Sequence, residues 1–68
     1  MRFEVWCIPK DRPEDKWQMD IDLPCVPRVG ELIYDESQMH SLEVVQVKYC
    51  VDAEGRHTGR IVLDVEPL

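Results

Sequence analysis

Hydrophobic and polar residues alternate along most of this chain with the period of two that strands show, and no segment follows the longer period of a helix. The clearest stretch is 17–23, in which every odd-numbered residue is apolar and every even-numbered one is polar. Because successive side chains of a strand point to opposite faces, this stretch predicts a strand with one buried and one solvated face.

Four further segments read as strands: residues 2–8, 31–34, 41–51 and 60–66. The longest of them changes parity, because Leu42 and Val44 occupy even positions whereas its later apolar residues occupy odd ones. A strand can hold both sets on one face only if it contains an extra residue. The pattern therefore predicts a bulge near Val44 and Val45.

The segments between these strands are rich in turn formers. Residues 9–16 carry two prolines and a run of charges, which predicts a solvated loop. Residues 24–30 contain two more prolines, which predicts a connection between strands. The polar segment 52–59 contains two glycines, which predicts a hairpin with a long loop. With no substantial helix in 68 residues, we expect one all-β domain over 1–68, a five-stranded antiparallel barrel or strongly curled sheet.

Residues 26–33 read V-P-R-V-G-E-L-I, and residues 42–47 read L-E-V-V-Q-V after an intervening turn. This pair resembles the V-G-D/E-x-V/I strand entry of SH3-like and Tudor/KOW-like small β-barrels. The resemblance implies an SH3-like barrel, and such barrels serve as non-catalytic binding modules for peptides, methylated side chains or nucleic acids. The chain departs from the nucleic-acid binders because it has no basic patch.

The chain carries 14 acidic and 8 basic residues, a formal net charge of -6. That charge repels phosphate backbones, so we expect no direct nucleic-acid binding and a preference for basic protein surfaces. Neither a signal sequence nor a membrane span can be drawn, and we expect no membrane partner. Three cysteines without a CxxC pair indicate reduced thiols, which favours a soluble, cytoplasmic protein.

Residues that could carry chemistry are dispersed along the chain. A structural zinc site draws paired ligands from tight turns, whereas the cysteines and histidines here occur singly, which predicts no metal and no cofactor. They are Cys7, Cys25, His40, Cys50 and His57. Two pairs of carboxylates, at 20 and 22 and at 64 and 66, are predicted to lie on a solvated face without the desolvation that a catalytic acid needs. We therefore expect no catalytic residue and no enzyme.

Aromatic residues offer a candidate binding anchor. Alternate residues of the first strand supply its inward face, which leaves Trp6 and Ile8 outside. An exposed Trp beside Ile is typical of a binding surface, but the 9–16 loop can equally bury Trp6, and both interpretations stay open. Trp17 and Tyr49 are expected to pack inside.

These observations predict a non-catalytic protein-interaction module with Trp6 and Ile8 as apolar anchors. Its candidate electrostatic guides are Asp20, Asp22, Asp64 and Glu66. A second copy of the chain is the first partner to consider, because a short sheet has unpaired edges. One alternative is an acidic inhibitor of phage or mobile-element type that mimics nucleic acid and binds a basic protein surface. A small enzyme or metal-binding protein ranks third.

Overall fold

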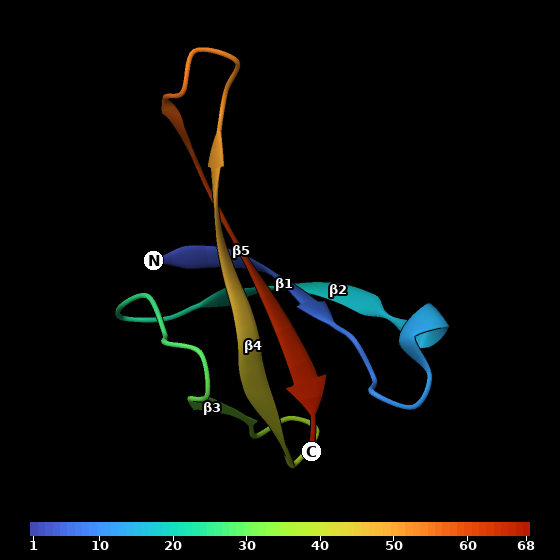
Figure 1. The fold of residues 1–68 in the computed structure, drawn as a ribbon. Helices are drawn as coiled ribbons and strands as arrows, with labels where there is room; N and C mark the ends of the chain where they lie inside the picture. Colours follow the sequence, from blue (N-terminus) through green and yellow to red (C-terminus); the bar gives the residue numbers. More distant parts are fainter.

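Residues 1–68 form a five-stranded sheet that curls into a half-barrel in the computed structural model (Figure 1). The strands are β1 (Arg2–Cys7), β2 (Trp17–Asp22), β3 (Leu32–Asp35), β4 (His40–Val51) and β5 (His57–Pro67). A short 3-10 turn, η1 (Pro13–Asp15), lies within the loop predicted at 9–16. The predicted all-β fold with a strongly curled sheet is confirmed. No helix of the structure has the length and hydrophobicity that a membrane-crossing helix needs.

The strand order is β2-β1-β5-β4-β3, so β5 lies at the centre and β2 and β3 form the two edges. Three of the ladders are antiparallel, but β1 and β5 run parallel. The sheet is therefore mixed rather than antiparallel throughout. No turn joins β1 directly to β5, so the hairpin signals in the sequence do not set the direction of this pair.

The core lies on the concave side of the sheet, where alternate side chains of the three central strands meet. Its eight buried members are Phe3, Val5, Cys7, Leu42, Val44, Ile61, Leu63 and Val65. Partly buried residues of the edge strands pack against this cluster, among them Met19, Ile21 and Ile33. The edge strands thus contribute to the core without closing over it.

Strand β4 contains the predicted bulge. Its ladder with β5 shifts register between Val44 and Gln46, which leaves Val45 without a partner in β5. Val44 and Val47 consequently share the face that points to the core, although one occupies an even and the other an odd position. The bulge explains how one long strand keeps its apolar side chains on the concave side.

The β4–β5 hairpin extends beyond the rest of the sheet as an arm (Figure 1). β5 begins at His57 rather than at the predicted residue 60, and residues 51–60 are all exposed. Tyr49, at the base of the arm, is 58% exposed, and Trp17, on edge strand β2, is 38% exposed. The prediction that both pack inside is wrong, because inward parity buries a side chain only where another strand covers it.

Candidate functional site

Trp6 and Ile8, the predicted apolar anchors, are both half-buried at the outer face and end of β1. The ammonium nitrogen of Lys16 lies 5.5 Å from the centroid of the Trp6 ring, which is a cation–π contact made by the loop that follows β1. The loop therefore covers part of the indole and leaves the rest exposed. The structure lies between the two interpretations that the sequence left open.

Asp64 is not the solvated carboxylate that the sequence predicts, because it is only 8% exposed. β5 is the central strand, so side chains of both neighbouring strands flank its outer face. The ammonium nitrogen of Lys48, on β4, lies 3.1 Å from the Asp64 carboxylate. Asp64 is therefore the largely buried partner of an ion pair whose lysine is about half exposed. Glu66 is half-buried, with Glu43 opposite it in the ladder.

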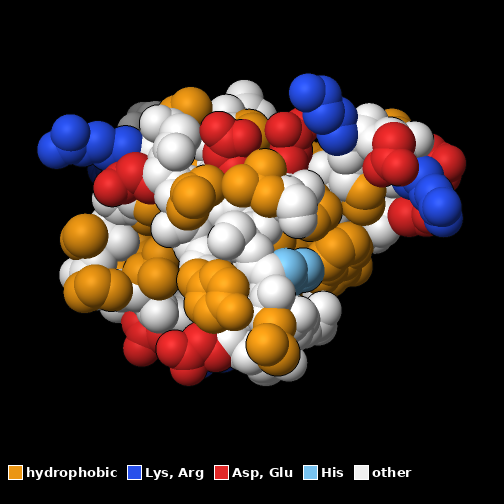
Figure 2. Space-filling model, turned by 90° about the horizontal axis from the view of Figure 1, so that it is seen from below, with side chains coloured by type: hydrophobic (Ala, Val, Ile, Leu, Met, Phe, Trp, Pro, Cys, Tyr) orange, Lys and Arg blue, Asp and Glu red, His pale blue; other side chains and the backbone are white.

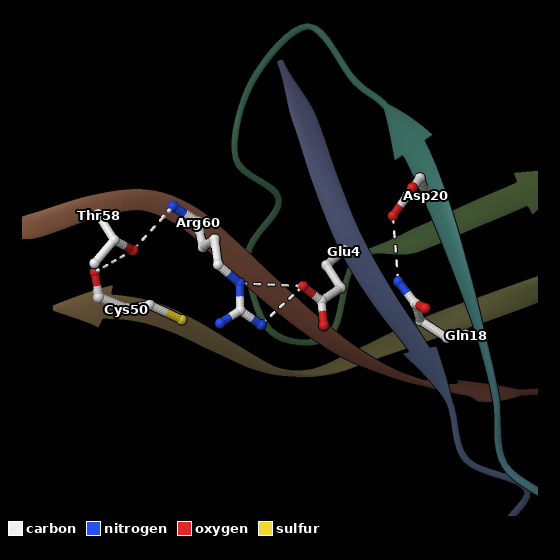
Figure 3. Close-up of polar contacts among 6 residues, drawn as sticks. All are labelled: Glu4, Gln18, Asp20, Cys50, Thr58 and Arg60. Atoms are coloured by element: carbon white, nitrogen blue, oxygen red, sulfur yellow. Dashed lines mark hydrogen bonds and ion pairs between the residues drawn. The ribbon is translucent and has the colours of Figure 1, made fainter. Parts of the chain in front are cut away.

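Asp20 and Asp22 are exposed on edge strand β2. The side-chain amide of Gln18 donates to Asp20 over 3.3 Å (Figure 3). The amino group of Met1 donates to the Asp22 carboxylate over 2.8 Å, and this hydrogen bond lowers the pKa of Asp22. Strand β1 lies between these two residues and the carboxylates of β5. The four predicted carboxylates consequently do not form one acidic surface.

A charged pair that the sequence did not indicate connects β1 to β5. Both Nε and Nη2 of Arg60 donate to one carboxylate oxygen of Glu4, over 3.2 and 2.9 Å (Figure 3). Close by, the hydroxyl of Thr58 donates to the carbonyl oxygen of Cys50 over 3.3 Å. The Arg60–Glu4 pair links the base of the arm to β1, and the Thr58–Cys50 hydrogen bond joins the two strands of the arm to each other.

The open side of the half-barrel holds a cleft lined mainly by apolar residues, with the carboxylates of Asp22, Glu31, Asp35 and Glu36 also in its walls. A hollow of about 420 Å³ lies between the end of β2 and β3, and another of about 330 Å³ lies between segment 23–27 and β3. Leu23, Ile33 and Tyr34 line both hollows, so the two form one continuous surface, which we call the open cleft. Figure 2 views the end of the molecule at which β3 lies and shows several groups of exposed hydrophobic side chains with acidic side chains at the margins.

Strand β3 borders the open cleft with an unpaired edge. The amide of Val44 donates to the carbonyl oxygen of Glu31, so Glu31 directs its backbone at β4. Along an antiparallel ladder, every second residue of a strand does the same, and the residues between them direct their backbone groups to the other side. Ile33 is therefore paired with β4, whereas the amides and carbonyls of Leu32 and Tyr34 point away from the sheet. The side chains of these two residues are 59% and 56% exposed.

Leu32 and Tyr34 are the candidate binding residues that the sequence analysis missed. The available signal was the uninterrupted apolar run from Leu32 to Tyr34, which puts apolar side chains on both faces of a very short strand. A strand with one buried face and one face in water shows alternating apolar and polar residues instead. An apolar residue on each face of an edge strand indicates a surface that another chain can cover.

The fold alters the acidity of the Cys7 thiol. It is fully buried, with its sulfur 3.6 Å from the sulfur of Met19. Burial raises the pKa of Cys7 to about 11, and the nearby negative charge of Asp35 adds to the rise. A thiol with this pKa stays protonated at neutral pH, so it lacks the thiolate that a nucleophile or a metal ligand requires.

Alkaline pH is expected to destabilise the fold through Cys7. Its pKa rises from 9.0 to about 11 on folding, so above pH 9 the unfolded chain releases a proton that the folded chain retains. The stabilisation is complete below pH 9 and is lost as the pH rises toward 11. Urea unfolding across this range measures the loss. Cys7→Ala is the control and should show a smaller decline; equal declines would contradict the prediction.

The residues of the structure contain no group of three or more His, Cys, Asp or Glu side chains placed to hold a metal ion. Comparisons of the chain with models of protein families, with curated proteins and with solved structures found no match in any of the three. The features of the structure that suggest a binding surface are the open cleft and the unpaired edge of β3.

Proposed function

We propose that this chain is a non-catalytic protein-interaction module that binds its partner through the open cleft. The observation that carries the proposal is the edge of β3, where Leu32 and Tyr34 present free backbone groups and exposed apolar side chains beside an apolar hollow. Natural sheets usually protect such an edge with charges, prolines or a covering segment. An apolar edge left open is typical of a docking surface.

The resemblance to SH3-like and Tudor/KOW-like barrels supports the same proposal. Residues 26–33 enter β3 and residues 42–47 lie in β4, so the segments that carry the resemblance form the β3–β4 pair beside the cleft. We propose that the half-barrel works as those modules do, by presenting one side of a small curled sheet to a protein ligand. Its three free cysteines favour a reducing, cytoplasmic location.

The acidic-inhibitor alternative rests on the net charge of -6. Of the carboxylates selected for it, Asp64 is buried against Lys48 and Asp22 bonds to the amino group of Met1, which leaves fewer free charges for a basic surface. The alternative predicts an affinity for the partner that falls steeply with added salt. Trp6 and Ile8 stay a proposed second contact surface, because both are partly exposed on the outer face.

Photo-crosslinking in the cell of origin tests the proposed surface. A photoreactive phenylalanine analogue replaces Tyr34 in one variant and Tyr49 in another, which are 56% and 58% exposed and so are matched in access. We expect a discrete crosslinked protein from position 34 and none of that identity from position 49. Crosslinks only from position 49, or only from the same analogue placed at Trp6, would move the binding surface away from the open cleft and reject the proposal.

A further inference from the structure

Resting on the proposed function, the geometry points to a partner that binds as an added strand: we propose that an extended segment with alternating apolar residues and basic ends pairs with the free edge of β3. Both edges of the sheet are unpaired, but they differ in chemistry. The edge position and charge of β3 together specify this class of ligand.

The backbone of β3 is arranged for pairing. Because Ile33 directs its amide and carbonyl to β4, Leu32 and Tyr34 direct theirs outward, which gives an added antiparallel strand four hydrogen-bonding groups to meet. The hollow between segment 23–27 and β3 runs along this edge, with Leu23, Pro24 and Pro27 among its lining residues. Side chains of the added strand would pack against the apolar walls of that hollow.

The other edge is protected against the same event. The amide of Leu23 donates to the carbonyl of Met1, so the odd-numbered residues of β2 direct their backbone groups at β1. The backbone groups that point away from the sheet therefore belong to Gln18, Asp20 and Asp22. All three carry polar side chains, and two are charged, which is how natural proteins discourage pairing at an edge. β3 has apolar side chains at the equivalent positions, so the sheet leaves this edge alone open to apolar pairing.

Charge around β3 selects the ends of the ligand. Glu43 lies opposite Leu32 in the ladder and Glu36 follows directly after β3, whereas Glu66 lies opposite Glu43 and farther from the free edge, on β5. None of these three glutamates takes part in an ion pair, whereas Glu4 and Asp64 elsewhere in the sheet do. Lysine or arginine residues flanking the apolar centre of an added strand would be attracted to these unpaired carboxylates.

A second copy of the chain fits this edge poorly. Two copies of β3 paired antiparallel about Ile33 would place Glu31 of each opposite Asp35 of the other, and like charges directly opposite destabilise a ladder. Each chain also carries a net charge of -6, which opposes association. The same negative charge attracts a basic peptide, so the ligand class follows from the features that disfavour self-pairing.

Synthetic peptides provide the test. The probe is the peptide KVTVTVK, capped at both ends, and its charge control is EVTVTVE. Titration into isotopically labelled protein is expected to shift the NMR signals of residues 31–36 and to slow amide exchange at Leu32 and Tyr34. The acidic peptide should bind at least about tenfold more weakly. Tyr34→Ser should weaken binding by about the same factor, and Tyr49→Ser should leave it unchanged.

Backbone methylation of the probe separates strand addition from simple apolar contact. One peptide is N-methylated at its valines and another at its threonines, which blocks the donors of one edge or the other. Strand addition predicts that one of the two loses binding while the other keeps it. Equal affinity for both, or signal shifts centred on β2 or the arm, would overturn the proposal, as would a dimer in sedimentation that Tyr34→Ser abolishes.

The two proposals fail in different ways. A cellular crosslink from position 34 without binding of KVTVTVK would reject strand addition and leave the open cleft as the interaction surface. Absence of a crosslink from position 34 in the presence of one elsewhere would reject the interaction surface itself.

Discussion

Leu63→Ala is expected to lower the free energy of unfolding by about 3–5 kcal/mol, which is the range for truncating a well-packed core leucine. Leu63 is fully buried on the central strand, opposite Val5 on one side and Val47 on the other. A domain of this length has a total stability of only about 3–10 kcal/mol. The substitution should therefore remove at least about a third of the stability of the domain, and it unfolds the chain if the total lies at the lower end of this range.

Urea unfolding followed by tryptophan fluorescence measures this effect. Leu68→Ala makes the same chemical change on a side chain that is largely exposed, so it should cost less than about 0.5 kcal/mol. Equal midpoints for the two variants would mean that the concave side is not the core of the domain. A large loss for Leu63→Ala alone supports a core built chiefly by the three central strands.

The strands themselves were predictable from the sequence because each carries its own signal. Period-two alternation located β2, and turn formers bounded the others. The bulge at Val45 was also predictable, since Leu42 and Val47 can share a face only if one residue is skipped. These features depend on local parity, and local parity is written in the sequence.

Features that depend on which strands become neighbours were not predictable in the same way. The parallel pairing of β1 with β5 joins segments from opposite ends of the chain, with no turn between them. The burial of Asp64 follows from the central place of β5, and the exposure of Tyr49 follows from the projecting arm. Parity states which face a side chain points to, but strand order decides whether that face is covered.

The candidate site shows the same division. Leu32 and Tyr34 are ordinary strand residues in the sequence, and they lie exposed at an unpaired edge only because the sheet stops at β3. By contrast, Asp22 and Asp64 suggested an acidic face in the sequence, and the fold gave each a cationic partner. A charged residue is therefore a weaker guide to this site than an apolar residue at an edge.

The pair of half-exposed Lys48 with largely buried Asp64 supplies the second large effect, and Lys48→Met is expected to cost about 1–3 kcal/mol of stability. Lys48 is about half exposed, but the Asp64 carboxylate is largely buried and would lose its only cation. Lys48→Met/Asp64→Leu should recover most of the loss, because an apolar pair leaves no buried charge.

Arg56→Met is the matched control for Lys48→Met, since the pair of Arg56 with Glu54 is 3.8 Å long and highly exposed. Exposed pairs contribute little, so this change should alter the free energy of unfolding by less than about 0.5 kcal/mol. Chemical unfolding of the three variants and the parent chain gives the comparison. Two results would contradict the prediction: a loss for Lys48→Met no greater than that for Arg56→Met, or a double variant less stable than Lys48→Met alone. Either would show that the buried carboxylate of Asp64 does not need the cation of Lys48 for the stability of the fold.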